Sequence, residues 1–526
     1  MKRQFIIGSR GSDLALWQAN FIASQLHNHA IKTEIRIIKT KGDQVQDLSF
    51  DKMEGKGFFT KELEEALTNK EIDLAVHSFK DLETQQPGGL VIGAVSYREE
   101  PNDLLIINKK SYDPKRKLAV KDSAVIGTSS ARRKSQILGM RSDTQLKDLR
   151  GNVPTRIDKL RKGEYDAILI AAAGVRRLEI DLSEFETELL DPEAFVPAPA
   201  QGVLACQVRE SDQELLEVLA EINHPLVQEA VGVEREILRL FEGGCQMPVG
   251  VYCKATEDDE GIPLYKVTAA RSLTWDKPPV LIYLESKNRE TLPAKVVDKF
   301  NQVQPCKVFI TRNLRKDDQF ANLLTANKFQ VYGKALIQTK LLDIQGGFKK
   351  EEIGWVFFSS KQAVKYFFMQ KPQLDNVKFG ALGKGTAYAI RKAGKNADFV
   401  GYSTDTRMTG KQFAATVGNA KVLFPQAKGS MRTIQQQFYN KEQVVNLLVY
   451  ETILHENEPI PPAETLLFTS PSNVQAFFKN NTIEANQKII AMGGATGKEL
   501  KNFGIHQCKL PSSFTDAGLA QAVFGY

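Results

Sequence analysis

The sequence is poor in cysteine and tryptophan, and it contains no long hydrophobic run. Its five cysteines (Cys206, Cys245, Cys253, Cys306 and Cys508) are too few and too irregularly spaced for a disulfide framework. No CxxC or HExxH spacing indicates a zinc site, so we expect no metal. No stretch reaches the roughly 18 apolar residues of a membrane span, and the start MKRQFIIGSRGSD does not fit a signal peptide. These absences predict a cytoplasmic protein that does not associate with membranes.

The charge balance lacks the strong excess that nucleic-acid binding requires. There are 70 basic and 63 acidic side chains, a formal net charge of +7, and no arginine-rich run interleaved with aromatic residues. We therefore expect no nucleic-acid partner, whereas a mild positive excess suits small polyanionic ligands. With 42% hydrophobic and 25% charged residues, the 526-residue chain has the composition of a globular protein with several domains.

The first half alternates short apolar runs with segments of helical periodicity, which is typical of an α/β fold with mainly parallel sheets. The expected strands are Phe5–Ile7, Thr33–Ile38, Asp73–Val76, Val91–Val95, Leu104–Ile107, Val125–Gly127 and Ala167–Ile170. Residues 218–285 differ, because one amphipathic helix is followed by three strand-like runs. That order predicts a small α+β domain with an antiparallel sheet. The polar segment 286–305 is expected to be a linker.

The second half contains an internal repeat at an offset of 110 residues. Phe358, Ser360, Val364, Phe367 and Phe368 match Phe468, Ser470, Val474, Phe477 and Phe478, and Ala381, Gly383 and Thr386 match Ala491, Gly493 and Thr496. Each copy predicts a strand, a serine-bearing turn, a helix, a second strand and a Gly-x-x-Thr turn that opens another helix. Such turns can bind an anion at a helix N-terminus, although each serine or threonine taken alone is more often a plain N-cap.

Asp81 is the most conspicuous acid, because it follows a buried strand directly in LAVHSFKDLE. A carboxylate there, beside Lys80, is able to stabilise a developing cation, while a helix N-cap or a surface ion pair is the alternative. His77 is a candidate general base, but a lone histidine at a strand end is more often packed and hydrogen-bonded.

Six arginines adjoin predicted strand ends or Gly/Ser turns: Arg10, Arg132, Arg133, Arg150, Arg156 and Arg177. Guanidinium groups bind carboxylates bidentately, so their convergence would form a site for a polycarboxylate or a phosphate. Taken singly, each is more often a solvated surface residue. Ser12, Ser129 and Asn152 lie in the same turns and would add neutral donors.

Two further segments contain candidate residues. Lys52 and Lys56 lie in FDKMEGKGFFTKE, a glycine-containing loop in which Phe59 is able to cover a planar ring. Cys245 lies in FEGGCQMPVG, where two glycines favour an exposed loop, whereas Cys206 and Cys253 fall within apolar runs. A lone cysteine is most often a small buried hydrophobic residue, so position alone does not make Cys245 functional.

The order of these motifs resembles porphobilinogen deaminase (hydroxymethylbilane synthase) across about residues 3–285. The matching motifs are GSRGSDLALWQ, GDQVQD, GKGFFTKELEEAL, DLAVHSFKDLE, REEPNDLL, GTSSARRKSQ, LRGNVPTRIDKL, YDAILIAAAGVRRL, PAPAQG and EGGCQMPVG. Residues 306–526 resemble uroporphyrinogen-III synthase through VFITR, FFSSKQAV, LVYET, FTSPSNVQAFF and AMGGATGKEL. The chain is therefore expected to be a fusion of two enzymes of tetrapyrrole biosynthesis.

The resemblance implies a role for each motif of the first half. A cysteine of GGCQ holds a dipyrromethane cofactor through a thioether, here Cys245, and Asp81 of HSxKD is the catalytic carboxylate, with Lys80 beside it. Lys80, Asp81, Ser129, Arg132 and Arg133 are implied in cofactor binding. The substrate-binding residues are implied to be Arg10, Ser12, Lys52, Lys56, Phe59, Arg150, Asn152, Arg156, Arg177 and Gln201. Porphobilinogen units are then joined on the primer with loss of ammonia, and hydrolysis releases hydroxymethylbilane.

For the second half the resemblance implies cyclisation of hydroxymethylbilane to uroporphyrinogen III, with inversion of the terminal ring. Tyr450 and Thr496 are the implied catalytic residues, and Ser470 is implied in substrate binding. The alternatives are a degenerate, structural synthase half, or a non-catalytic protein that binds polycarboxylates. We expect a monomer acting on these two small molecules.

The two families also imply a domain plan. The first half is expected to contain two α/β domains like those of periplasmic binding proteins, followed by the small α+β domain that carries the cofactor cysteine. The second half is expected to contain two similar α/β domains. The expected limits are 1–99 with 200–217, 100–199, 218–285, a linker over 286–305, 306–338 with 455–526, and 339–454.

Overall fold

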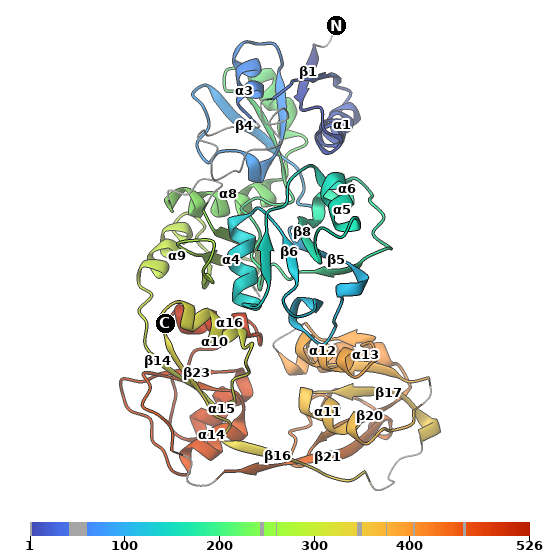
Figure 1. Ribbon diagram of the computed structural model, residues 1–526, viewed down its shortest axis with the longest axis vertical. Coiled ribbons are helices and arrows are strands. Elements are labelled where there is room, and N and C mark those ends of the chain that lie inside the picture. Colours follow the sequence, from blue (N-terminus) through green and yellow to red (C-terminus); the bar gives the residue numbers. More distant parts are fainter. Residues whose placement is uncertain are drawn as a thin grey trace. The chain divides into compact units, whose positions relative to one another are not determined.

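The chain forms two compact units (Figure 1). The computed structural model describes residues 3–40, 60–241, 247–258, 260–344, 350–374, 376–402, 405–455 and 459–526. The first unit consists of Met1–Gln304, Asp317–Lys328 and Phe524–Tyr526, and the second of Pro305–Lys316 and Phe329–Val523. No helix within these described ranges is long and apolar enough to cross a membrane.

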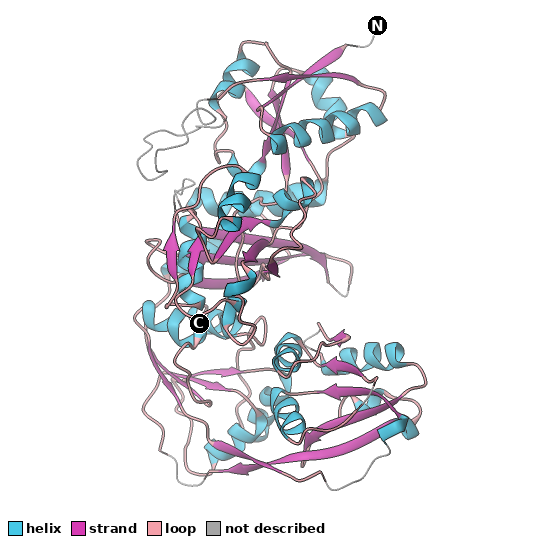
Figure 2. Cartoon of the chain, turned by 45° about the vertical axis from the view of Figure 1, so that its right-hand side comes forward, coloured by secondary structure: helices cyan, strands magenta, loops and turns pink. Residues whose placement is uncertain are grey.

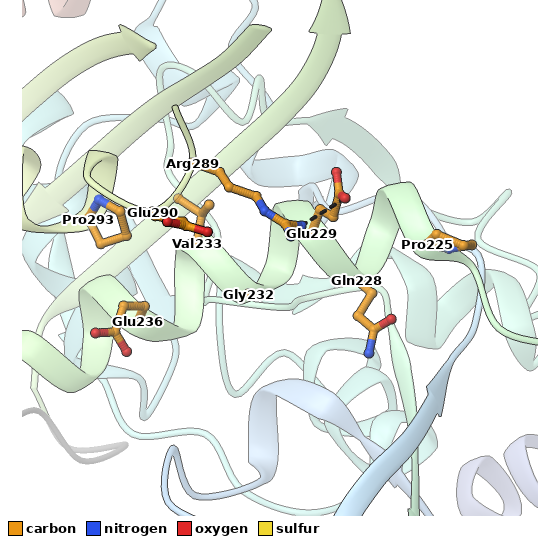
Figure 3. A pocket seen from close by; sticks show the side chains of 9 residues that line it. All are labelled: Pro225, Gln228, Glu229, Gly232, Val233, Glu236, Arg289, Glu290 and Pro293. Atoms are coloured by element: carbon orange, nitrogen blue, oxygen red, sulfur yellow. Dashed lines mark ion pairs between the residues drawn. The ribbon is translucent and has the colours of Figure 1, made fainter. Parts of the chain in front are cut away.

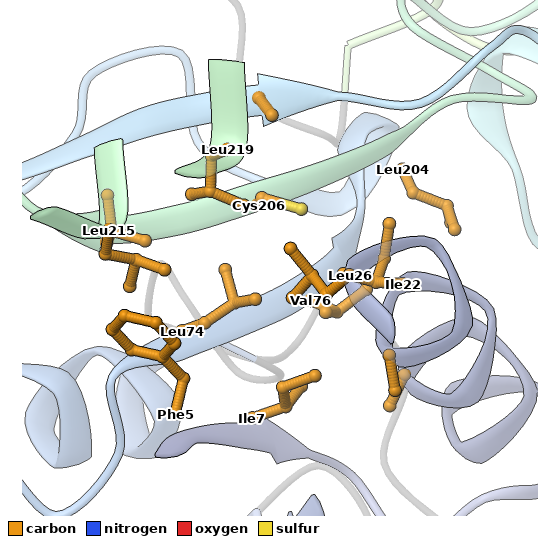
Figure 4. Close-up of a cluster of buried hydrophobic side chains, with 14 residues drawn as sticks. Phe5, Ile7, Ile22, Leu26, Leu74, Val76, Leu204, Cys206, Leu215 and Leu219 are labelled. Atoms are coloured by element: carbon orange, nitrogen blue, oxygen red, sulfur yellow. The ribbon is translucent and has the colours of Figure 1, made fainter. Parts of the chain in front are cut away.

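The first sheet of unit 1 has the strand order β2-β1-β3-β10-β4. Its strands are β1 (Gln4–Ser9), β2 (Lys32–Ile37), β3 (Leu74–Ser78), β4 (Leu90–Val95) and β10 (Leu204–Arg209). One face packs against helices α1 (Asp13–Asn28) and α7 (Gln213–Ala220) through a core that includes Phe5, Ile7, Leu74, Cys206 and Leu215 (Figure 4). The other face is covered by α3 (Lys61–Thr68).

The second sheet has the order β7-β6-β8-β5-β9. It comprises β5 (Asp103–Ile107), β6 (Val125–Gly127), β7 (Gln145–Lys147), β8 (Ala167–Ala171) and β9 (Glu186–Leu189), with helices α4 (Ala131–Met140), α5 (Val153–Arg161) and α6 (Ala172–Arg177). Each of these two sheets has two parallel and two antiparallel pairings. The prediction of mainly parallel sheets is therefore wrong here, because hydrophobic periodicity reports burial and carries no information on strand direction.

The third sheet is antiparallel, as predicted, with the order β11-β12-β13. Its elements are α8 (Pro225–Leu240), β11 (Val249–Glu257), β12 (Pro263–Arg271), β13 (Val280–Ser286) and α9 (Leu292–Asn301). Helix α9 lies inside the segment expected to be a linker, and its Leu292 and Val296 are buried in the core of this sheet. The fully buried Glu234 of α8 accepts hydrogen bonds from Arg98 (2.6 Å) and from the backbone N–H groups of Ala200 and Cys253 (both 2.7 Å). These bonds fix α8 to the connection between the first two sheets.

Unit 2 is built around a four-stranded and a six-stranded sheet. The four-stranded sheet, β15-β14-β22-β23, is parallel throughout its described pairings. It contains β14 (Lys307–Ile310), β15 (Gln330–Gly333), β22 (Thr465–Phe468) and β23 (Lys488–Ala491), with α14 (Pro471–Phe478), α15 (Gly494–Asn502) and α16 (Asp516–Phe524). Helix α10 (Gln319–Ala326) follows β14 in sequence but belongs by its contacts to unit 1.

The six-stranded sheet has the order β16-β21-β20-β17-β18-β19. Its elements are β16 (Ile337–Leu341), β17 (Ile353–Phe358), β18 (Lys378–Ala381), β19 (Phe399–Val400), β20 (Lys421–Ala427) and β21 (Val444–Leu454), with α11 (Lys361–Met369), α12 (Lys384–Lys392) and α13 (Thr406–Val417). Alternate residues of β17 enter two different cores: Val356 and Phe358 pack with α11, and Trp355 and Phe357 pack with α13. Helices accordingly cover both faces of this sheet (Figure 2).

The predicted repeat is present in both sheets of unit 2. The first copy is β17, α11, β18 and α12, and the second is β22, α14, β23 and α15, each in the predicted order. Ser360 and Ser470 cap α11 and α14, and Gly383 and Gly493 precede α12 and α15.

Candidate functional site

The parallel strands β1 and β3 bring predicted site residues together at their carboxyl ends. Gly8 pairs with Ala75, and Arg10, just beyond the end of β1, acts electrostatically on His77. His77 Nε2 lies 3.0 Å from Gln207 Oε1, and the ring is buried. Burial lowers the pKa of His77 to about 4; the hydrogen bond to Gln207 opposes this shift and Arg10 adds to it. The burial of His77 and its hydrogen bond to Gln207 match the alternative to a general base, a packed and hydrogen-bonded histidine.

Lys80 and Asp81 lie in a single 3-10 turn, Phe79–Asp81, that follows β3 directly. Asp81 is exposed and Lys80 is half-buried. Burial lowers the pKa of Lys80 to about 8, while Asp81 raises it and Arg133 lowers it. The turn thus presents a carboxylate to solvent beside a lysine whose charge depends on small changes in its surroundings.

Helix α8 contacts this turn through Arg235. Arg235 donates to the carbonyl oxygens of Phe79 (3.0 Å) and Leu82 (3.1 Å), and its guanidinium carbon lies 4.2 Å from the centre of the Phe79 ring. Sequence reasoning missed Arg235, because an arginine inside an amphipathic helix gives no signal that distinguishes it from a solvated one. Its burial shows that it positions the residues that follow β3.

Arg132 and Arg133, at the start of α4, both bind the carboxylate of Asp103. Arg132 Nη1 lies 2.7 Å from Asp103 Oδ2, and Arg133 Nη2 lies 2.7 Å from Asp103 Oδ1. Burial alone would raise the pKa of Asp103, but the two guanidinium groups hold that pKa well below its usual range. Asp103, the first residue of β5, was not a predicted site residue, although an acid entering a fully apolar strand is the pattern that could have revealed it.

Two further predicted arginines, Arg156 and Arg177, lie in unit 1. Burial lowers the pKa of Arg156 to about 10, with Arg133 lowering it further and Asp81 raising it, so Arg156 is within electrostatic range of both. Arg177 is buried, donates to the carbonyl oxygen of Gly202 (2.7 Å) and lies over the Trp17 ring. Its Nε has no hydrogen-bond partner among the described residues.

Gln201 is buried beside the same carboxylate. Its Nε2 donates to the Pro101 carbonyl oxygen (2.7 Å) and to Asp103 Oδ1 (3.2 Å). Its Oε1 is buried and has no hydrogen-bond partner in the described part of the chain. An unpaired buried acceptor costs free energy, which a bound donor would recover.

The predicted neutral donors are largely used in local structure. Ser12 accepts from Ala15 N–H (3.4 Å) as the N-cap of α1, and Asn152 accepts from Thr155 N–H (2.9 Å) as the N-cap of α5. Ser129 Oγ bonds both the carbonyl oxygen (2.9 Å) and the N–H (3.0 Å) of Leu149. These residues shape the loops that carry Arg150 and the other arginines.

Lys52, Lys56, Phe59 and Cys245 lie outside the described residues. Cys206 and Cys253 are buried in apolar cores. Burial raises the pKa of Cys206 to about 12 and that of Cys253 higher still, so neither thiol is reactive at neutral pH. Within the described ranges no cluster of His, Cys, Asp and Glu is arranged to hold a metal ion.

In unit 2, Tyr450 lies on β21 and stacks on Tyr366 with ring centroids 5.4 Å apart. Its hydroxyl is 3.3 Å from Ser360 Oγ, which also accepts from Ala363 N–H (3.1 Å) as the N-cap of α11. Ser470 caps α14 by accepting from Asn473 N–H (3.3 Å), and Thr496 is buried in the first turn of α15. Among the described residues no hydrogen bond joins Tyr450 to Ser470 or to Thr496.

A separate surface pocket of about 420 Å³ is lined by α8 and the start of α9 (Figure 3). Glu229 forms an ion pair with Arg289 across it (2.8 Å) and accepts from the Tyr265 hydroxyl (2.7 Å). The lining contains none of the predicted site residues. The ion pair holds α8 against the segment that leads into α9, and the hydrogen bond from Tyr265 holds α8 against β12.

Three family models match the chain. "Porphobilinogen deaminase, dipyromethane cofactor binding domain" matches residues 5–217, "Porphobilinogen deaminase, C-terminal domain" matches 228–271, and "Uroporphyrinogen-III synthase HemD" matches 318–521. Among curated proteins, a porphobilinogen deaminase of Bacillus anthracis is 45% identical over 259 residues, 49% of this chain and 82% of that protein. That of Bacillus velezensis is 42% identical over 281 residues, 51% of this chain and 88% of that protein.

Solved structures similar to parts of the chain include a uroporphyrinogen-III synthetase from Helicobacter pylori. It is 17% identical and covers 41% of this chain and 98% of its own, with a TM-score of 0.32. A periplasmic binding protein of Salmonella typhimurium is 12% identical and covers 42% of this chain and 92% of its own, with a TM-score of 0.26.

Proposed function

Because the chain belongs to the porphobilinogen deaminase family and carries a uroporphyrinogen-III synthase domain behind it, we propose that its two halves act in sequence on one substrate. The first half joins porphobilinogen units into hydroxymethylbilane with release of ammonia. The second half closes that product into uroporphyrinogen III with inversion of the terminal ring.

The observation that carries the first half is the exposed carboxylate of Asp81 beside two half-buried cations. Asp81 acts electrostatically on both Lys80 and Arg156, and it comes from the end of a buried strand. A carboxylate held there stabilises positive charge that develops on a pyrrole when ammonia leaves. It also accepts a hydrogen bond from the pyrrole N–H and so orients the ring.

The surrounding residues fit a polycarboxylate primer and product. When bound through Cys245, the dipyrromethane supplies the terminal pyrrole carbon to which the next unit is joined. Lys80, Arg132, Arg133 and Arg156 supply positive charge for its acetate and propionate groups, and the unpaired Nε of Arg177 is a further donor for a substrate carboxylate. We propose the same use for Arg10 and Arg150.

The primer is tested by intact mass. Protein made in cells that produce porphobilinogen is expected to be heavier than its bare sequence by the mass of the dipyrromethane. Cys245→Ser is expected to remove both the added mass and all turnover. Cys206→Ala is the matched control and should keep both, because Cys206 is part of an apolar core. A wild-type mass equal to the bare sequence would refute the covalent primer.

The role of Asp81 is tested by Asp81→Asn, which keeps the shape and removes the charge. Loss of one group that stabilises charge in the transition state lowers kcat by about 10²–10³-fold. The control is Asp181→Asn, an acid that accepts hydrogen bonds from Ser183 on the surface of the same unit. Equal ammonia release by Asp81→Asn and the wild type would contradict the assignment.

In the second half, Tyr450 is proposed to assist loss of the bilane hydroxyl, with Thr496 and Ser470 as further contacts to the bilane. The hydrogen-bonding distance between Tyr450 and Ser360 supports this proposal, because the contact orients the phenol at the N-terminus of α11.

The isomer ratio of the product tests whether the second half is active: the intact chain fed with porphobilinogen is expected to release mainly the type III isomer. Type I alone would favour a degenerate, structural synthase half. The monomeric state and cytoplasmic location remain predictions.

A further inference from the structure

Two large apolar side chains lie exposed beside the Gly-x-x-Thr turn of the second repeat copy. Leu510 is 51% exposed and Phe514 is 44% exposed. Both belong to the segment 510–515, which leads into α16. This segment starts at the carboxyl end of β23, because Lys509 pairs in parallel with Ile490 of that strand. In α/β sheets of this kind, ligands bind at the carboxyl ends of the strands.

The Phe514 ring meets this turn by its edge. A Cβ on Gly493 would lie 3.0 Å from ring carbon Cε1 and 3.2 Å from Cζ, so only a residue without a side chain leaves room for the ring. Gly493 also has a φ of 130°, a conformation that other residues rarely adopt. One turn further along α15, a Cβ on Gly497 would lie 3.8 Å from Leu510 Cδ2. Thr496, a predicted site residue, is in the first turn of α15 that these two side chains flank.

The first repeat copy shows that such a turn forms without an aromatic ring against it. Gly383 occupies the position of Gly493, and among the described residues a Cβ on Gly383 would meet only the carbonyl oxygen of Gly401, at 3.7 Å. Helix α12 nevertheless begins after Gly383 as α15 begins after Gly493. The backbone plan of the turn therefore does not require Phe514. Within the part of the chain that the structure describes, its ring also stacks on no other aromatic ring.

An aromatic ring that is fixed by its edge and exposed elsewhere is suited to a flat, electron-rich ring of a ligand. The linear tetrapyrrole is a chain of such rings, and offset stacking holds a ring by its face, whatever groups its edge carries. We propose that Phe514 is a stacking residue of the second half, on which one pyrrole ring of hydroxymethylbilane lies. Leu510 is the apolar neighbour of that ring, and the ring is held next to Thr496. This inference rests on the proposed synthase function.

The test uses the full chain, in which ammonia release by the first half is an internal control. Purified hydroxymethylbilane is supplied to measure KM and kcat of the second half. Phe514→Ala and Phe514→Leu are each expected to raise KM about five- to ten-fold with a smaller change in kcat, because both remove the flat ring. Phe514→Tyr keeps the ring and should retain the wild-type KM. Phe503→Leu, at a phenylalanine that is 42% exposed at the other end of α15, is the matched control and should leave KM unchanged.

Phe514→Leu separates stacking from a purely structural role, because a leucine still covers the glycine turn. A structural role predicts a wild-type KM for Phe514→Leu and a lowered Tm for Phe514→Ala, and that result would overturn the stacking residue while type III synthesis by the wild type stands. A KM raised as much in Phe514→Tyr as in Phe514→Ala would also overturn it. A wild type that makes only type I would instead refute the function on which the inference rests.

Discussion

At the end of β3, two basic side chains have pKa values well below their ordinary ones. His77 has a pKa of about 4 and Lys80 of about 8, in both cases chiefly because burial disfavours the charged form. His77 is consequently neutral throughout the neutral range. Lys80 changes its charge only slightly above neutral pH, where the enzyme's substrate carboxylates remain ionised.

The neutral state of His77 predicts a loss of stability in acid. The unfolded chain binds a proton near pH 6.5, and the folded chain binds it only near pH 4, so stability falls as the pH drops through this window. At the acid end of this window, the lowered pKa of His77 reduces the free energy of unfolding by about 3 kcal/mol. His77→Gln should flatten this part of the pH dependence, as measured by urea unfolding of unit 1. An equally steep decline in the variant would contradict the prediction.

Lys80 predicts an effect at alkaline pH. Its positive charge is present well below pH 8, is half lost at about pH 8 and disappears above it, so kcat/KM for porphobilinogen should fall on the alkaline side. Lys80→Arg keeps the charge at all pH values and should move that fall to higher pH by more than one unit. A pH profile of ammonia release checks this, and identical alkaline limbs would count against a role for the charge.

At this scale the sequence pointed to the arginines and Asp81 by their positions after strands and turns. In the structure Asp81 and Arg133 each act electrostatically on both Lys80 and Arg156. The sequence did not predict Asp103 or Arg235, because their importance depends on burial against segments far away in the chain. A motif shows which side chain occupies a turn, whereas the partner that holds it comes from the tertiary fold.

The helix N-termini of unit 2 show how far a repeated pattern can be interpreted. The repeat predicted the order of strands and helices correctly, because hydrophobic spacing and Gly or Ser turns are local signals. It did not show that Ser360, and not Ser470, contacts Tyr450, since β21 reaches that sheet from outside the repeat. The two copies therefore share a backbone plan and differ in their surroundings.

Substitutions of the two capping serines distinguish a role in helix capping from a role in binding the bilane. Ser360→Ala and Ser470→Ala should each lower the stability of unit 2 by about 1 kcal/mol, and Asp at either position should restore the cap. Ser470→Asp is expected to lower the type III fraction despite its restored cap, because a carboxylate there repels the bilane. Thermal unfolding and the isomer ratio, measured on the same samples, check both parts. Full type III synthesis by Ser470→Asp would exclude Ser470 from the binding site.

On the scale of the whole molecule, residues 317–328 belong by their contacts to unit 1, although the synthase family model begins at residue 318. Asp317 forms an ion pair with Arg116 (3.2 Å), and Lys117 donates to Gln319. Leu323 of α10 is buried, and its side chain fills the space over Gly139 of α4. A family boundary drawn from sequence thus does not coincide with a boundary of packing.

This packing predicts that a substitution within the synthase match weakens the deaminase unit. Leu323→Ala removes a buried side chain and should cost about 2–5 kcal/mol, lowering the temperature at which ammonia release is lost. Leu226→Ala, at a leucine of α8 that is 68% exposed, should leave that temperature unchanged. If the two variants inactivate at the same temperature as the wild type, α10 does not contribute to the stability of unit 1.

Strand β10 lies between β3 and β4 in the first sheet. In the chain, however, it follows both of them by more than a hundred residues, because the second sheet is inserted before it. In unit 2, β22 pairs with β14, although the strands of the six-stranded sheet lie between the two in the chain. During synthesis, neither sheet can close until the ribosome has passed the whole inserted domain, so each insert has to fold while its host remains open. Such long-range closure makes folding slow and leaves strand edges exposed, and we expect both halves to depend on chaperones during synthesis more than their final stability suggests.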